Sequence, residues 1–434
     1  MIPQGATHPL DVCILGLGYI GLPTASLLAT KGFRVHGVDV NEVLIQNLQQ
    51  GKCVIYEPAL DVMVKSALQS GKLTADTRPR EADIFIICVP TPFAAGHKPD
   101  LRHVRAAAAG IAPLLRNGNL VILESTVPVG ATEGMAETLA SMRPDLRIGR
   151  HGPENAPPVH VAHCPERVLP GRILHELVEN DRIVGGIDPE STRMGVAFYR
   201  GFVSGNVQGT DSRTAEMIKL TENSFRDVNI AFANELSLIC KELGLDVWKV
   251  IALANRHPRV NILQPGAGVG GHCIAVDPWF LVDSAPETAR LIRTAREVND
   301  AKPEKIIAQT LEAVARMPHA TVACLGLAFK PDIDDLRESP ALSIAEALAG
   351  KNMPLVICEP HIHHLPPSLQ GKPHVRHMPL ADCLQQGDII LALVGHKAFA
   401  AIDAETLAGK TVIDACGLWR NRRPACPEGN GNKS

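Results

Sequence analysis

A glycine-rich turn near the start of the chain constrains the fold most strongly. Residues 16–21 read Gly-Leu-Gly-Tyr-Ile-Gly, directly after an apolar run at 11–15 and before a helical stretch at 23–31. A second apolar run at 34–38 ends at Asp39. This succession is typical of a dinucleotide-binding unit, in which the glycines permit a tight turn and the helix N-terminus faces the pyrophosphate. An acid after the second strand binds a ribose hydroxyl and would repel a 2′-phosphate, so we predict NAD as the cofactor. The predicted contacts are Gly16, Gly18, Tyr19, Ile20, Gly21 and Asp39.

Two threonines follow further predicted strands of the same sheet. Thr91 comes after the apolar run 84–89, and Thr126 comes after the run 121–123. Ligands in such folds lie at the carboxyl ends of the strands, so we expect both threonines near the cofactor. Either one alone is as typical of a turn or a helix cap.

The rest of the chain predicts two α/β parts joined by a helical middle. Residues 213–243 form one helical pattern without Pro or Gly, about 45 Å long, with Gly244 and Asp246 as caps. Strand patterns return at 321–325, 355–358, 389–394 and 411–413, and Ser339-Pro340 opens a helix between the first two. We predict an α/β fold with two Rossmann-type parallel-sheet domains. The predicted boundaries are 1–205 for NAD binding, 206–315 for the helical and dimerising middle, 316–420 for substrate binding, and 421–434 for a disordered tail.

Composition excludes several classes of partner. The net charge of −3 gives no reason to expect nucleic acid or anionic membrane, and no apolar stretch approaches 18 residues. The 11 cysteines are scattered, odd in number and without a CxxC pair, which indicates reduced thiols and a cytoplasmic protein.

A second glycine-rich segment, at 266–278, carries the candidate nucleophile. Cys273 lies at its end, beside His272 and four residues before Asp277. A thiol in a loop that approaches a ligand closely is a candidate nucleophile, whereas most cysteines are small buried side chains. From spacing alone both interpretations stay open for Cys273, and His272 is better explained as structural.

Polar groups on the long helix and before it extend this candidate site. Lys219 and Asn223 are one turn apart, with Arg226 on nearly the same side, so they could stabilise an oxyanion or simply form a solvated face. Glu166, in Cys-Pro-Glu-Arg-Val, is a possible general base. The acids Asp332, Asp334 and Asp335 could suggest a metal site, but they lie between Lys330 and Arg337. A turn before the Ser339 cap explains the acids adequately, so no metal is predicted.

Together these motifs resemble the UDP-glucose/GDP-mannose dehydrogenase family over residues 12–420. The matching segments are the N-terminal glycine turn, Val89-Pro90-Thr91-Pro92, Glu124-Ser125-Thr126, Pro165-Glu166, Lys219 with Asn223, Gly270 to Cys273 with Asp277, and Gly326 to Arg337. The segments 214–217, 221–227 and 255–261 and the His272-Cys273 pair are most similar to the branch acting on UDP-N-acetylhexosamines.

The resemblance implies a four-electron oxidation of the sugar C6 alcohol to a carboxylate, with UDP-N-acetyl-D-mannosamine as the expected substrate and UDP-N-acetyl-D-glucosamine as the alternative. It implies Cys273 as a covalent nucleophile through a thiohemiacetal and a thioester, with Lys219, Asn223, Asp277 and Glu166 as the other catalytic residues. It implies Arg337 at the cofactor phosphates and a homodimer through the long helix. The substrate contacts that it implies are Arg167, Val168, Lys219, Asn223, Arg226, His257, Arg259, Gly270, Phe329 and Lys330.

Three positions depart from patterns in the family. Val276 and Pro170 replace a Lys and a Glu of the UDP-glucose enzymes, as is normal for the N-acetylhexosamine branch. Cys416 stands where close relatives often have a substrate-binding Lys. Two other interpretations remain as alternatives: a one-hydride dehydrogenase of small hydroxy acids, and a binding protein derived from an enzyme. Cys273 and the complete C-terminal part argue against the first. The presence together of Cys273, Lys219, Asn223 and Asp277 argues against the second.

Overall fold

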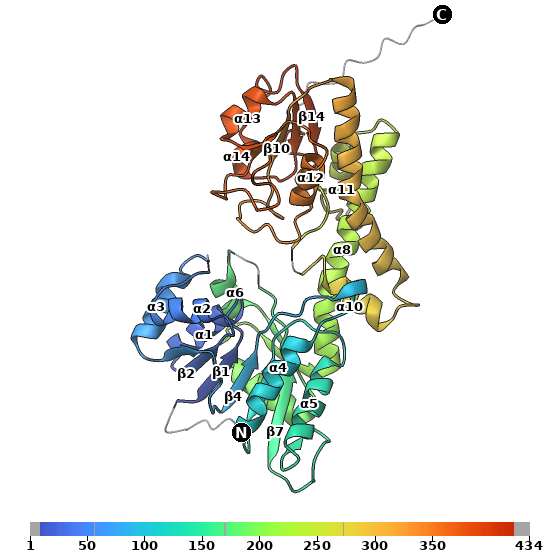
Figure 1. The fold of residues 1–434 in the computed structure, drawn as a ribbon. Helices are drawn as coiled ribbons and strands as arrows, with labels where there is room; N and C mark the ends of the chain where they lie inside the picture. The colour runs from blue at the N-terminus through green and yellow to red at the C-terminus, as the bar shows by residue number, and fades with distance from the viewer. Residues whose placement is uncertain (1–8, 56, 169–170, 272, 421–434) are drawn as a thin grey trace, which may run out of the picture. The chain divides into compact units, whose positions relative to one another are not determined.

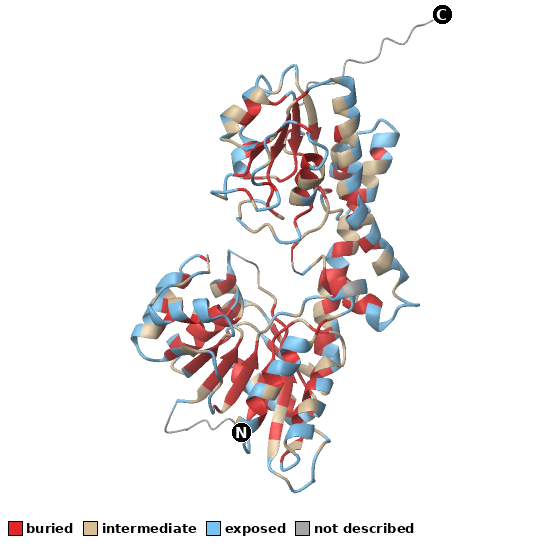
Figure 2. Cartoon of the chain, in the orientation of Figure 1, coloured by how far each residue is buried: buried red, intermediate tan, exposed pale blue. Residues whose placement is uncertain are grey.

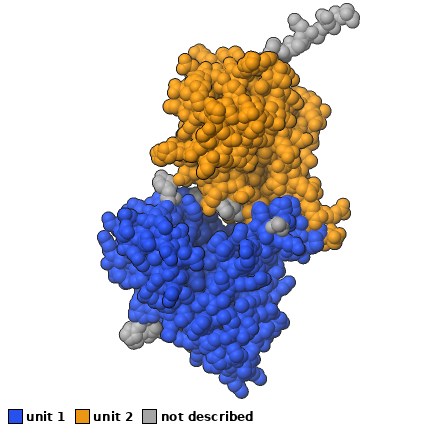
Figure 3. All heavy atoms as spheres, in the orientation of Figure 1, with its two compact units in different colours: residues 1–222, 279–286 blue, residues 223–278, 287–434 orange. Residues whose placement is uncertain are grey.

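The computed structural model describes residues 9–55, 57–168, 171–271 and 273–420. The chain divides into two compact units, residues 1–222 with 279–286 and residues 223–278 with 287–434 (Figure 3). The predicted tail at 421–434, His272 and Pro170 lie outside the described residues. The division into three domains at 205/206, 315/316 and 420/421 stays a prediction.

The first unit is built on one sheet (Figure 1). Its strand order is β3-β2-β1-β4-β5-β7-β8-β9, with β6 paired to β7. The strands are β1 (Asp11–Leu15), β2 (Arg34–Val38), β3 (Leu73–Asp76), β4 (Ile84–Ile87), β5 (Leu120–Leu123), β6 (Arg147–Ile148), β7 (Pro158–His163), β8 (Arg182–Gly186) and β9 (Val207–Asp211). The central strands β4 and β5 are buried along their whole length, as expected of a parallel sheet covered by helices on both faces (Figure 2).

Helices connect these strands. They are α1 (Gly21–Thr30), α2 (Glu42–Gln49), α3 (Leu60–Gln69), α4 (Arg102–Ile111), α5 (Ala131–Met142), α6 (Ile173–Glu179) and α7 (Pro189–Tyr199), with short 3-10 turns at Ala95–His97 and Ala112–Leu114. The predicted strands and helices around the glycine turn are confirmed. One feature was not predicted: β8 runs antiparallel to β7, while the other pairs of this sheet among the described residues are parallel.

The second unit contains a smaller parallel sheet in the order β12-β11-β10-β13-β14. Its elements are β10 (Val322–Leu325), α12 (Pro340–Ala349), β11 (Leu355–Cys358), β12 (Val375–His377), α13 (Leu380–Gln386), β13 (Ile389–Ala392), α14 (Lys397–Ala400) and β14 (Thr411–Asp414). Ser339 caps α12 by accepting a hydrogen bond from the Leu342 amide, as its sequence predicts. The α/β fold with two Rossmann-type sheets is therefore confirmed.

The predicted long helix is α8 (Ser212–Glu242), with 31 residues. Gly244 follows two residues after its end with a φ of +69°, as expected of a glycine at a helix C-terminus, and Asp246 then caps α9 (Val247–Ala254). A second long helix, α11 (Arg290–Arg316), contains Pro303 and was not predicted. Buried polar contacts between the two helices stabilise α11: Arg296 pairs with Asp227 at 2.6 Å. The short helix α10 (Asp277–Ser284) lies between α9 and α11 in the sequence.

The two sheets share one local arrangement. In the first unit the Gly16 amide donates to the carbonyl of Val38, and the Leu17 amide donates to the Asp39 carboxylate at 2.8 Å. In the second unit the Gly326 amide donates to the carbonyl of Cys358, and the Leu327 amide donates to Glu359 at 2.7 Å. A glycine turn after the first strand is thus tied to an acid after the second strand in both units.

Among the described residues, every helix is either too short or too polar to cross a bilayer.

Candidate functional site

The glycine turn of the first unit has the geometry that a dinucleotide requires. Gly16 has φ +92°, and a Cβ there would lie 2.7 Å from the Cys88 carbonyl oxygen. A Cβ on Gly21 would lie 1.8 Å from the carbonyl oxygen of Gly16, so these two glycines are needed for the turn itself. A Cβ on Gly18 would meet nothing within 4 Å. Gly18 therefore faces open space just before the N-terminus of α1, where a pyrophosphate can approach the backbone.

The neighbouring predicted cofactor residues lie around this turn. Tyr19 is 38% exposed and Ile20 precedes α1. Asp39 is half-buried, and its carboxylate accepts a hydrogen bond from the Leu17 amide of the turn. The hydroxyl of Thr91 donates to the carbonyl oxygen of Thr126 at 2.6 Å, so the ends of β4 and β5 are tied together. The residues of this unit fit NAD, which would supply the hydride acceptor.

Glu166 lies in a buried network of the same unit. One carboxylate oxygen accepts from the Arg182 guanidinium at 2.7 Å, and the other accepts from the Arg167 amide at 2.6 Å. Glu166 and Arg182 are 7% and 2% exposed, so this ion pair is removed from water. The carboxylate is held in one orientation, which suits a positioning or electrostatic role better than proton transfer with bulk water.

A second carboxylate, Glu124, completes this network. Tyr199 donates to it at 2.5 Å and the Cys88 thiol donates at 3.2 Å. Burial and the nearby charge of Glu166 raise the pKa of Glu124. Arg182 was not predicted, because one arginine at the start of a strand matches no motif. Only its position before the apolar run 183–184 marks it as unusual in the sequence.

Other predicted residues of the first unit flank this network. The Arg167 side chain pairs with Glu222 at 2.6 Å, and Val168 is half-buried. Lys219 is half-buried on α8. Burial and, to a smaller extent, the charge of Lys219 lower the pKa of His163 to about 3, so this histidine is neutral at neutral pH.

The second unit brings three predicted catalytic residues together. Cys273 is exposed, and its carbonyl oxygen accepts from the Asp277 amide at 2.8 Å, one helical turn later. The Asp277 carboxylate is buried and accepts a short hydrogen bond from the side-chain amide of Asn223 on α8. Asn223, Asp277 and Cys273 therefore form one cluster, and Lys219 precedes Asn223 by one turn of the same helix.

The glycine-rich segment packs directly on the loop that carries Phe329 and Lys330. A Cβ on Gly270 would lie 2.3 Å from the Glu338 carbonyl oxygen, and one on Gly271 would lie 2.8 Å from the Phe329 ring. Glycine is therefore needed at these two positions for close packing between the two loops, whether or not the backbone also approaches a ligand.

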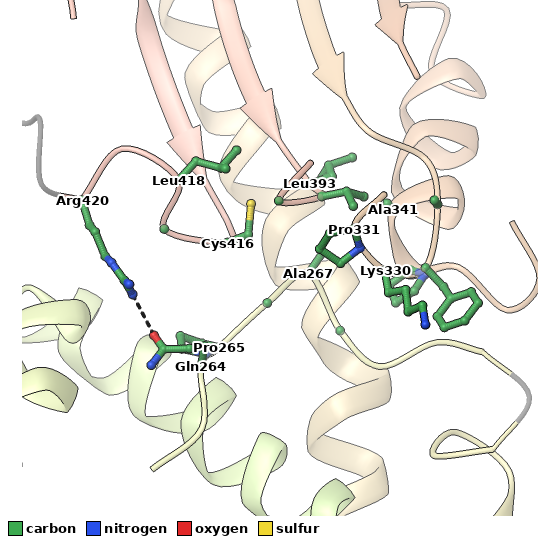
Figure 4. Close-up of a pocket in the computed structure, with 18 residues that line it drawn as sticks. Gln264, Pro265, Ala267, Lys330, Pro331, Ala341, Leu393, Cys416, Leu418 and Arg420 are labelled. Atoms are coloured by element: carbon green, nitrogen blue, oxygen red, sulfur yellow. Dashed lines mark hydrogen bonds between the residues drawn. The ribbon is translucent and has the colours of Figure 1, made fainter. Parts of the chain in front are cut away.

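A cavity of about 590 Å³ opens beside these loops (Figure 4). It is lined by the residues that follow β10, β13 and β14, including Lys330, Leu393 and Cys416, and by Gln264 and Ala267. These strands flank the point where the strand order of the sheet reverses, which is where α/β sheets bind ligands. Its volume is typical of a small-molecule site.

The remaining predicted contacts are less defined. Arg226, His257 and Arg259 are exposed, and Arg337 forms an ion pair with Asp335 at 2.6 Å. Their roles stay predictions.

A group of possible metal ligands exists in the second unit. Asp332, His361 and His396 place ligand atoms within 4.8 Å of one another. However, His396 accepts from the Asp332 amide through Nδ1 at 2.9 Å, so its Nε2 carries the proton and donates to Glu359 at 3.1 Å. Both ring nitrogens of His396 are thus engaged in hydrogen bonds within the protein, and the absence of a metal remains a prediction.

Comparison with known proteins is consistent with this geometry. Three domains of one family, the UDP-glucose/GDP-mannose dehydrogenase family, match successive parts of the chain: the NAD binding domain at 10–203, the central domain at 213–301 and the UDP binding domain at 323–421. The chain is 53% identical over 418 residues to UDP-N-acetyl-D-mannosamine dehydrogenase of Escherichia coli strain K12, covering 94% of this chain and 99% of that protein. It is 53% identical over 415 residues to NDP-N-acetyl-D-galactosaminuronic acid dehydrogenase of Ralstonia nicotianae, covering 95% and 97%.

A solved structure shows the same fold. UDP-D-ManNAc dehydrogenase from Pyrococcus horikoshii superposes with a TM-score of 0.83 at 38% identity, covering 97% of each chain. With the cofactor turn, the Cys273 cluster and the cavity of the second unit, these matches show that the chain belongs to the UDP-glucose/GDP-mannose dehydrogenase family as an NAD-dependent nucleotide-sugar dehydrogenase.

Proposed function

We propose that the chain oxidises UDP-N-acetyl-D-mannosamine at C6 to UDP-N-acetyl-D-mannosaminuronate. The observation that carries this proposal is the 53% identity, over nearly the whole of both chains, to a UDP-N-acetyl-D-mannosamine dehydrogenase. The exposed Cys273, one turn before the Asp277–Asn223 pair, supports the covalent chemistry that a carboxylate product requires.

In the proposed mechanism, Cys273 is the nucleophile. Oxidation of the C6 alcohol with loss of one hydride gives an aldehyde. The Cys273 thiolate adds to this aldehyde and forms a thiohemiacetal, and loss of a second hydride leaves a thioester. Water cleaves the thioester, releasing the uronate carboxylate and the Cys273 thiol. NAD, held by the glycine turn of the first unit, would accept one hydride in each of the two oxidations. Lys219 and Asn223 stabilise the developing oxyanion, and Asp277 holds Asn223 in position. Glu166, fixed by Arg182, contributes a negative charge that orients water or substrate.

Substrate binding is proposed to use the second unit together with residues before it. The cavity beside Lys330 and Phe329 takes the nucleotide part of the substrate. Arg167, Val168, Arg226, His257, Arg259 and Gly270 are the further proposed contacts, and Arg337 binds the cofactor phosphates.

One finding favours a second substrate. The identity to the NDP-N-acetyl-D-galactosaminuronic acid dehydrogenase of Ralstonia nicotianae is also 53%. Sugars that differ only in the configuration of ring carbons make nearly the same contacts, so a UDP-N-acetyl-D-galactosamine-type substrate is the second candidate. UDP-N-acetyl-D-glucosamine remains the alternative expected from the sequence.

The test is the amount of NADH formed when each of the three nucleotide sugars is limiting. We expect two NADH for each UDP-N-acetyl-D-mannosamine and little from the others. Two NADH from another epimer alone would change the assigned substrate and leave the proposed mechanism unaltered.

With Cys273→Ser we expect loss of acid formation and retained binding of NAD and sugar nucleotide. Full turnover by that variant would exclude the covalent mechanism.

A further inference from the structure

The cavity of the second unit carries positive charge at two separate places. Lys330 follows β10, and Arg420 lies beyond β14 on the opposite side of the opening (Figure 4). None of the described residues that line this cavity is an Asp or Glu. The rest of the lining is mainly apolar or backbone, with Ala267, Leu393 and Leu418 among the apolar side chains. An apolar cavity with two cations and no acid suits a ligand that has a flat uncharged part and an anionic part.

Arg420 is held in place although it is exposed. Its guanidinium donates to the side-chain oxygen of Gln264 at 3.1 Å, and lies 5.8 Å from the centroid of the Trp248 ring. Trp248 packs on Gly417, where a Cβ would lie 2.6 Å from the indole ring. Because these contacts orient the guanidinium before a ligand arrives, less side-chain entropy is lost when it binds an anion.

Because residue 416 is a cysteine, Arg420 is the cation that lines the cavity on the side opposite Lys330. Burial, together with the neighbouring Asp414, raises the pKa of the Cys416 thiol far above its ordinary value. The thiol therefore does not become a thiolate that would repel a phosphate, and its sulfur lies 3.9 Å from the Ala392 carbonyl oxygen, to which it donates. Because a cysteine has no cationic form, binding of a diphosphate in the cavity depends on Lys330 and Arg420.

We propose that Arg420 binds a phosphate group of the nucleotide sugar and supplies, opposite Lys330, the positive charge that Cys416 lacks. This inference rests on the proposed function, because it assumes that the cavity takes the nucleotide. A guanidinium presents a planar pair of donors that matches two phosphate oxygens, so Arg420 contributes to affinity and fixes the position of the diphosphate.

The test compares binding of UDP and uridine to the full chain by ligand-observed NMR. Arg420→Met keeps much of the apolar stem and removes the charge. We expect a Kd for UDP about 10 to 100 times higher, as loss of one charged hydrogen-bonding group predicts, with an unchanged Kd for uridine. Arg376→Met removes an exposed arginine on β12, outside the cavity, and serves as the matched control. It should leave both dissociation constants unchanged.

A rescue experiment separates charge from folding. In the double variant Arg420→Met, Cys416→Lys, a new cation lies on the same side of the cavity, and we expect UDP affinity to return to within a few-fold of the original. Equal loss of UDP and uridine binding in Arg420→Met, or no loss of either, would overturn the role of Arg420. Failure of the unaltered chain to bind UDP would instead overturn the proposed function, and the inference with it.

Discussion

At the scale of single residues, Lys302 is the least expected charge. It is 6% exposed on α11, and its ammonium donates to the Ser237 hydroxyl and, at 3.4 Å, to the Asn234 carbonyl oxygen. Burial, with a smaller contribution from the charge of Lys241, lowers its pKa from 10.5 to about 8. Two neutral partners do not compensate fully for the water that the ammonium loses.

Replacing this lysine should stabilise the protein in a manner that depends on pH. Because the folded-state pKa is below the unfolded-state value, the unfolded chain binds more protons between pH 8 and 10.5, and stability rises with pH in that window. The destabilisation caused by burying the charged Lys302 ammonium is fully present below pH 8 and is on the order of 3 kcal/mol. We expect Lys302→Met to raise the free energy of unfolding at pH 7 by up to about that amount, and the gain to shrink toward pH 10.5.

Urea unfolding at pH 7 and pH 10 would measure this effect. Lys305→Met, an exposed lysine on the same helix, controls for the general titration of lysines. An equal effect of Lys302→Met at both pH values would show that packing, not charge, causes it.

The candidate residues show what a sequence can reveal at this scale. Cys273, Asp277 and Asn223 were predicted because the glycine-rich segment and the helical spacing mark them, and the structure brings them together. Arg182 and Arg420 were not predicted, because each is positioned by hydrogen bonds to residues that are distant in the sequence. Glu166 is 16 residues from Arg182, and Gln264 is 156 residues from Arg420.

At the scale of elements, α8 was predicted almost to the residue and α11 was missed. An uninterrupted run without Pro or Gly defines α8 from local preference alone. In α11, Pro303 argues for a break, and the contacts that offset it, such as Arg296 with Asp227 of α8, are tertiary. The antiparallel strand β8 was missed for the same reason, since strand direction is set by pairing.

The exposed face of α8 leads to a prediction about assembly. Phe225, Phe232 and Ile239 are 67%, 54% and 45% exposed, and they repeat every seven residues along one side of the helix. A stripe of this kind is costly in water, so we propose that it forms the dimer interface. We expect Phe232→Asp to shift the molar mass, measured by light scattering, from dimer toward monomer.

Val62→Asp introduces the same charge at an exposed hydrophobic residue of α3 and should leave the mass unchanged. A monomeric unaltered chain, or a dimer that Phe232→Asp does not weaken, would contradict this interface.

At the scale of the whole molecule, two sheets with the same glycine turn perform different tasks. In the second unit Glu359 accepts from the amides of Leu327 and Ala328 and from His396, so its carboxylate is fully engaged. Pro331 stands five residues after Gly326, where the first unit has Gly21 after Gly16, and α12 begins only at Pro340. Among the described residues of the second unit, no helix N-terminus follows the turn directly, whereas in the first unit α1 begins at Gly21 and can face the pyrophosphate of a dinucleotide.

We accordingly expect one NAD for each chain. Calorimetric titration should give a stoichiometry of one, and Gly18→Val, which fills the open space over the turn, should abolish that binding without affecting UDP. A second NAD retained in Gly18→Val would show that the sheet of the second unit also binds dinucleotide.

The chain passes from one unit to the other three times, after Glu222, after Pro278 and after Pro286. Asn223 and Asp277 stand beside the first two of these passages and are hydrogen-bonded to each other. Neither unit can consequently be produced alone by shortening the chain from one end, since its segments are interleaved with those of the other. A protease that cut after Glu222 would separate residues 1–222 from residues 279–286 of the same unit, so the two resulting peptides would not correspond to the two units.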